Sequence, residues 1–83
     1  MLIHSPQELA MAVANQRKKI KMSQTMAADL VGLKQQTVSA FENKPGSTEL
    51  DTLFRILAAA NLDLYIFPKD KILGKESQWQ EEW

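Results

Sequence analysis

The stretch SQTMAADLVGLKQQTVSAFE, from Ser23 to Glu42, holds two short apolar-periodic segments separated by one glycine. Ser23 can cap a helix that starts directly after it, and Gly32 supplies the left-handed residue that commonly ends one. A second helix is predicted over residues 35–43, and the small Ala28 would let the two helices cross closely. The apolar residues expected on the inner faces of this pair are Met26, Ala27, Leu30, Val31, Leu33, Val38 and Phe41.

The second helix of this pair is left with a polar outer face. In a helix-turn-helix that helix lies in the major groove of DNA, where amide, hydroxyl and ammonium groups can pair with base edges. The candidate base-reading residues are Lys34, Gln35, Gln36 and Ser39. Candidate phosphate contacts are Gln24, at the start of the first helix, Thr37 and Lys44. The alternative is an ordinary tight helix pair whose surface glutamines read nothing.

Further helices are expected on both sides of this pair. The stretch SPQE places Ser5 as an N-cap, Pro6 at the first helical position and Glu8 at the third, which predicts a helix ending near residue 20 or 21. Its expected apolar stripe is Leu9, Ala12, Val13 and Ile20. After the loop NKPGST, Thr48 should cap a fourth helix with Asp51 in its first turn. Its expected core-facing residues, spaced i, i+3, i+4 and i+7, are Leu50, Leu53, Phe54 and Leu57.

A change of period follows the fourth helix. Residues 62–67, LDLYIF, alternate as a β-strand does and stop at Pro68. One strand cannot satisfy its own backbone groups, and the sequence offers no second strand, so antiparallel pairing with another copy is expected. The residues assigned to this dimer strand are Leu62, Leu64, Tyr65 and Ile66.

Charge is uneven along the chain although the net charge of the 83 residues is zero. Residues 1–44 carry six Lys/Arg against three acidic residues, or +3, and residues 45–83 carry four against seven, or −3. The basic half holds the helix pair, and a local basic field can attract phosphate. The alternative for its RKKIK run is a solvated helix end, where cations favour the helix dipole.

Catalysis and metal binding are poorly supported. The chain has one histidine, His4, and no cysteine, and it contains none of the common nucleophile, phosphate-loop or zinc motifs. We expect no enzyme activity, no metal and no cofactor. No signal peptide or membrane span is apparent, so a cytoplasmic protein is expected.

The polar end of the chain, residues 68–83, is expected to be a flexible tail after a domain over residues 1–67. It contains both tryptophans, Trp79 and Trp83. Tryptophan is enriched among interface hot spots, so these two residues are candidates for contact with a protein partner.

The same segments carry a resemblance to a known family. The spacing Gln24…Ala28…Gly32…Val38…Phe41-Glu42 resembles the helix-turn-helix of phage Cro and repressor proteins. Within that family, the closer similarity is to HipB-type antitoxins, and it rests on SPQELAMAV, GLKQQTVSAFENKPGSTELDTLFRIL, the single strand and a tail ending in Glu-Trp.

The resemblance implies an all-α domain of four to five helices with one C-terminal β-strand that pairs across a dimer. It also implies repression of the protein's own operon through an inverted-repeat operator, and binding of a HipA-type Ser/Thr kinase toxin. Trp79 and Trp83 of the tail are our candidates for contact with that toxin. The family's base-contacting positions fall on Lys34, Gln35, Gln36 and Ser39. The alternative function is a module that binds and neutralises a protein partner without any DNA role.

Overall fold

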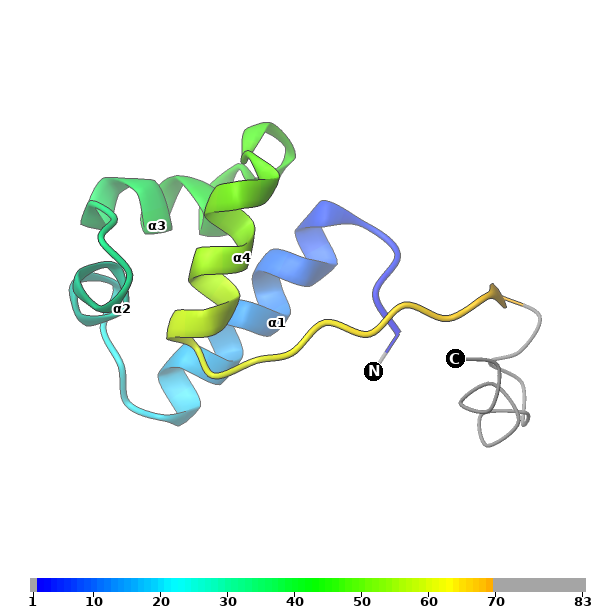
Figure 1. Cartoon of the computed structure of the whole chain (residues 1–83), viewed down its shortest axis with the longest axis horizontal. Helices are drawn as coiled ribbons and strands as arrows, with labels where there is room; N and C mark the ends of the chain where they lie inside the picture. Colours follow the sequence, from blue (N-terminus) through cyan, green and yellow to red (C-terminus); the bar gives the residue numbers. More distant parts are fainter. Residues whose placement is uncertain (1, 70–83) are drawn as a thin grey trace.

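The computed structural model describes residues 2–69, which fold as a bundle of helices followed by an extended segment (Figure 1). The helices in chain order are α1 (Pro6–Lys19), α2 (Gln24–Leu30), α3 (Gln35–Asn43), the 3-10 turn η1 (Pro45–Ser47) and α4 (Leu50–Ala59). The predicted all-α, helix-turn-helix architecture is therefore confirmed.

The start of α1 is capped nearly as predicted. Ser5 accepts a hydrogen bond from the Glu8 backbone N–H at 3.1 Å, and Pro6 occupies the first helical position. The reciprocal bond differs from a standard capping box, because the Glu8 carboxylate accepts from the N–H of His4, at 2.6 Å, rather than from that of Ser5. Glu8 thereby fixes the backbone of His4, which precedes the N-cap residue.

The turn between α2 and α3 follows the sequence closely. Ser23 accepts from the Met26 backbone N–H at 3.0 Å and caps α2. Gly32 has a φ of 70°, which an L side chain rarely adopts, and a Cβ added there would meet nothing within 4 Å. Glycine is needed here for backbone conformation and not for space. The Leu33 N–H closes the turn on the Ala28 carbonyl at 2.9 Å.

The predicted cap of α4 is wrong. Glu49, not Thr48, is the N-cap residue, and its side chain makes no capping bond. The Thr48 N–H instead bonds the Pro45 carbonyl at 3.1 Å and closes the η1 turn. Because Thr48 is committed to this turn, the helix begins only at Leu50.

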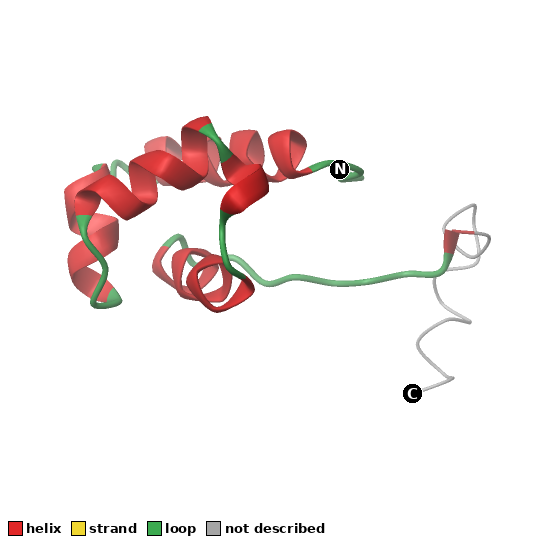
Figure 2. Ribbon diagram, turned by 90° about the horizontal axis from the view of Figure 1, so that it is seen from above, coloured by secondary structure: helices red, strands yellow, loops and turns green. Residues whose placement is uncertain are grey.

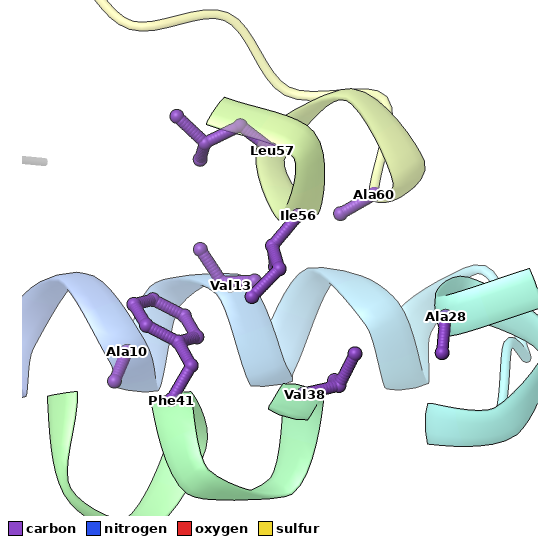
Figure 3. Packing of buried hydrophobic residues seen from close by; sticks show 8 residues of the cluster. All are labelled: Ala10, Val13, Ala28, Val38, Phe41, Ile56, Leu57 and Ala60. Atoms are coloured by element: carbon purple, nitrogen blue, oxygen red, sulfur yellow. The ribbon is translucent and has the colours of Figure 1, made fainter. Parts of the chain in front are cut away.

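The core lies where α1, α3 and α4 meet, and it is bordered by Ala28 near the end of α2. In Figure 3, Ile56 points from α4 toward Val13 on α1, while Phe41 points up from α3 beside them. The buried cluster consists of Ala10, Val13, Ala28, Val38, Phe41, Ile56, Leu57 and Ala60.

Several residues expected in the core lie at the surface. Leu50 and Phe54 are 71% and 53% exposed, although they share the predicted stripe with the buried Leu57. Helix α4 carries two overlapping apolar stripes, and the one that faces the core is Leu53, Ile56 and Leu57, continued by Ala60 directly after the helix. On the other helices the same correction applies to Ile20, Met26 and Leu30, which are exposed.

The segment over residues 62–67 runs as an extended chain away from the helices (Figure 2). It forms no strand pairing within residues 2–69. Its start is anchored by the Leu62 N–H, which bonds the Leu57 carbonyl at 2.9 Å. The rings of Tyr65 and Phe67 stack with centroids 6.5 Å apart, so these alternate residues lie on one side, as in a β-strand. Pairing of Leu62, Leu64, Tyr65 and Ile66 with a second copy stays a prediction.

The predictions for the C-terminal tail lie outside the described residues. This applies to Trp79 and Trp83 and to all of the tail after residue 69, so the division into a domain over 1–67 and a tail over 68–83 stays a prediction.

Candidate nucleic-acid interface

The predicted reading face lies on one end of the bundle, at the start of α3 (Figure 1). Lys34, Gln35 and Gln36 are exposed, and Ser39 is half-buried one turn later. The structure therefore places Gln35, Gln36 and Ser39 in the first turns of α3, with Lys34 as the N-cap residue directly before them. Val38 and Phe41 of the same helix are buried in the core.

Ser39 is oriented by a neighbour that the sequence had not singled out for the site. The Asn43 side-chain amide donates to the Ser39 carbonyl at 2.9 Å and to its hydroxyl at 3.2 Å. The hydroxyl hydrogen of Ser39 is left to donate elsewhere. Asn43 is four residues along the same helix, and this spacing is the signal that could have found it.

Beneath this face lies an ion pair between α1 and α3. The Arg17 guanidinium donates to the Glu42 carboxylate through Nε at 2.7 Å and through Nη2 at 2.9 Å. Its Nη1 donates to the Met22 carbonyl at 2.8 Å, which holds the link between α1 and α2. The two side chains are only 10% and 9% exposed.

The pair shifts both ionisation equilibria toward the charged forms. Hydrogen bonding to Glu42 raises the pKa of Arg17 against the opposing effect of burial. For Glu42, burial acts to raise the pKa, but the bonds from Arg17 and Gln24 and the attraction of Arg17 and Lys18 together lower it. Both groups are therefore charged at neutral pH.

The sequence grouped Arg17 with the RKKIK run, either as part of a basic field or as a solvated helix end, and the structure buries it. The position of Arg17 on the helix could have indicated its burial, because Ala10, Val13 and Arg17 form a buried stripe at i, i+3 and i+7 on α1. The stripe had been expected to continue through Ile20, which is exposed. The acceptor for Arg17 lies 25 residues away, so no local pattern identifies it.

Gln24 links the ion pair to the reading face. Its Nε2 donates to Glu42 Oε1 at 2.9 Å, and its Oε1 accepts from Gln35 Nε2 at 2.6 Å. The half-buried Gln24 thus retains a single amide hydrogen for any phosphate. Its structural partners were not foreseen.

The other two candidate phosphate contacts lie at opposite ends of α3. Thr37 is half-buried in its first turn, and Lys44 is exposed directly after its last residue. Further exposed cations lie at the end of α1 (Lys18 and Lys19) and two residues after it (Lys21). Because Arg17 and Glu42 neutralise each other, their burial leaves the basic balance of this half unchanged.

Other kinds of site find little support in residues 2–69. No group of three or more His, Asp or Glu side chains there is arranged to hold a metal ion. None of the helices in that range is long and apolar enough to cross a membrane.

Comparison with known proteins places this geometry in a family. A helix-turn-helix family model matches residues 13–67. The chain is 34% identical over 82 residues to Antitoxin HipB of Escherichia coli O6:H1, an alignment that covers 98% of this chain and 87% of that protein. Antitoxin HipB of Escherichia coli strain K12 is also 34% identical over 82 residues, with 98% and 93% covered. This chain belongs to the HipB family of helix-turn-helix antitoxins.

Solved structures of that family match the fold. The HipB-O4 20mer complex aligns with a TM-score of 0.80 and 37% identity, over 82% of this chain and 96% of that one. The HipA-HipB-O2-O3 complex gives the same values. Similarity to HipB proteins thus extends over most of both chains.

Proposed function

We propose that this protein is a sequence-specific DNA-binding repressor that also serves as the antitoxin of a HipA-type Ser/Thr kinase toxin. The observation that carries the proposal is the polar face of α3 inside a HipB-family fold, where Gln35 donates a hydrogen bond to Gln24 and Gln24 donates one to Glu42. Two solved relatives, one complexed with a 20mer and one assembled with HipA, support the DNA and toxin roles respectively. Such a repressor would act in the cytoplasm, at its own operon.

In this function α3 enters the major groove. Gln35 and Gln36 present amides to base edges, Lys34 presents an ammonium group, and Ser39 presents a hydroxyl hydrogen. Phosphates on either side would be held by Gln24, Thr37 and Lys44, together with the N-terminal backbone N–H groups of α2.

Direct reading of bases predicts a selective loss of affinity. Gln35→Ala or Gln36→Ala should each weaken binding to the operator by about 1–3 kcal/mol, and binding to random DNA much less. Gel-shift titration of both duplexes measures the difference. Gln7→Ala is the matched control, since Gln7 is an exposed glutamine on α1 and should change neither affinity. Wild-type operator affinity in both α3 variants would show that this face does not read DNA.

Dimerisation is part of the proposal, and apolar exposure supports it. Phe54 on α4 and Leu64, Tyr65 and Ile66 on the extended segment expose large apolar side chains. The side chains of this segment and of α4 line a shared groove. Pairing of residues 62–67 with the same residues of a second copy would cover these side chains and would complete the backbone hydrogen bonds. The two α3 helices would then meet half-sites about 10 bp apart.

The C-terminal tail is proposed as a toxin contact. Trp79 or Trp83 would fill an apolar pocket on the toxin, with the acidic residues between them facing basic residues at its rim. Truncation after Lys75 should lower toxin affinity at least about tenfold, or 1.4 kcal/mol, and leave operator affinity intact. Calorimetry with the toxin and gel shift with the operator test the two halves. Unchanged toxin affinity would move the toxin contact to the helical body.

A further inference from the structure

We propose that Lys21, in the connection between α1 and α2, binds the phosphate backbone of DNA, and that the chain tolerates an unfavourable backbone conformation there to keep an ammonium group at this point. The inference rests on the proposed function. It adds a phosphate ligand to the three candidates at Gln24, Thr37 and Lys44.

The backbone conformation of Lys21 does not suit its residue type. Three residues within 2–69 have a left-handed conformation, and each follows a helix: Lys21, Gly32 and Asn61, with φ of 59°, 70° and 59°. Glycine and asparagine adopt this conformation readily, whereas a side chain such as lysine makes it unfavourable. Lys21 is therefore the exception among the three.

Hydrogen bonds on both sides of Lys21 impose this conformation. The Lys21 N–H bonds the Lys18 carbonyl at 3.0 Å, and the Met22 N–H bonds the Arg17 carbonyl at 2.9 Å, the two bonds that define a Schellman motif. The end of α4 has the same motif with Asn61 in the left-handed position. Since this motif favours glycine or asparagine at that position, the local fold does not explain the lysine.

Interaction with the helix dipole does not explain Lys21 either. Cations are favourable at the C-terminus of a helix, but the last turn of α1 already carries Arg17, Lys18 and Lys19. Lys21 lies beyond that turn, and its exposed side chain makes no ion pair or hydrogen bond with any other residue in the range 2–69. A residue held in an unfavourable conformation without a structural benefit points to a function.

The place of Lys21 in the fold suits contact with phosphate. In a helix-turn-helix the first helix of the pair crosses the DNA backbone, and here that helix is α2. Lys21 lies shortly before Ser23, the N-cap of α2, and Gln24, its first residue. In Figure 1 the connection after α1 leads directly to α2. Lysine carries a compact charge on a flexible stem, which binds phosphate without demanding a fixed geometry.

Two substitutions separate the charge of Lys21 from its backbone conformation. Lys21→Gly removes both the ammonium group and the strain, whereas Lys21→Gln removes the ammonium group alone. Arg55→Gln is the charge control, since Arg55 is an exposed cation on α4. Asn61→Gly is a control for melting temperature only, because asparagine already tolerates a φ of 59°. The full-length variants are melted, and the two Lys21 variants and Arg55→Gln are titrated with operator and scrambled duplexes at several salt concentrations.

Stability and DNA affinity should change in opposite directions in Lys21→Gly. Relief of the strain should raise its melting temperature by about 4 °C, and Asn61→Gly should gain clearly less. Both Lys21 variants should bind DNA about tenfold more weakly at roughly 0.1 M salt, with a slope of log affinity against log salt that is shallower by about 0.9 for each bound copy. The two duplexes should lose affinity alike, because a phosphate contact carries no sequence information. Arg55→Gln should leave the slope unchanged.

Three results would overturn the inference. The first is an unchanged affinity and salt slope in both Lys21 variants, and the second is a loss confined to the operator duplex. The third is a Lys21→Gly variant that melts no higher than wild type, since lysine would then not be unfavourable at that position. A wild-type protein that binds neither duplex, or binds both without regard to salt, would instead contradict the proposed function itself, so the two failures are distinguishable.

Discussion

Glu42→Ala should lower the free energy of unfolding by about 3 kcal/mol at neutral pH, because it leaves the Arg17 guanidinium buried without its carboxylate partner. Urea denaturation followed by circular dichroism measures the loss. The matched control is Asp51→Ala, which removes the exposed Arg55–Asp51 pair, 3.9 Å apart with side chains 52% and 86% exposed. That control should cost at most about 0.5 kcal/mol. Equal effects in the two variants would show that the buried pair has no special role in stability.

The contribution of Glu42 to stability should depend on pH in a defined direction. Its pKa is lower in the folded protein than the ordinary value of 4.5. The stabilisation is therefore fully present above that ordinary value and is lost as the pH falls through the folded-state pKa. The stability difference between wild type and Glu42→Ala should shrink over that interval. A difference that stays constant, or grows, in acid would contradict the assigned ion pair.

Leu64→Pro should convert the dimer to a monomer and weaken operator binding by about 100-fold or more. Proline removes a backbone donor from the proposed strand pair, and separated subunits lose the gain of binding two half-sites at once. Leu64 lies outside the buried cluster, so each helical domain should stay folded. Leu64→Val keeps the N–H and serves as the control. Sedimentation measures the oligomeric state, and a proline variant that remains dimeric would exclude pairing through this strand.

Local signals in the sequence predicted the helices well. Ser5 and Ser23 cap α1 and α2 through their own side chains, and Gly32 ends α2 in a left-handed conformation. Each of these effects depends on residues within one helical turn. The bounds of α3 also match the predicted residues 35–43, and Val38 and Phe41 face inward as expected.

Predictions that depended on distant contacts fared less well. The sequence of α4 permits two apolar stripes, and only packing against α1 and α3 selects the one with Ile56 over the one with Phe54. Thr48 does not cap α4 as expected, because its backbone N–H closes the preceding η1 turn.

In the candidate site, too, local features could be predicted from the sequence and distant contacts could not. Helical spacing was enough to predict that Gln35 and Gln36 are exposed in the first turn of α3 and that Val38 and Phe41 are buried. The bonds beneath that face join α1, α2 and α3, and Arg17 reaches a partner 25 residues along the chain. A single sequence does not specify which distant donor meets which acceptor, so the support for Gln35 became visible only in the folded chain.

If α3 reads a specific DNA sequence, competition between operator and random DNA at several salt concentrations will reveal it. The duplexes are the region upstream of the protein's own operon and a scrambled one of equal length. We expect at least about a thousandfold preference for the operator. The log affinity should also fall steeply with log salt, by about 0.9 for each phosphate neutralised. Equal affinity for the two duplexes, or binding that ignores salt, would contradict sequence-specific reading by α3 and would favour a protein-only interaction module.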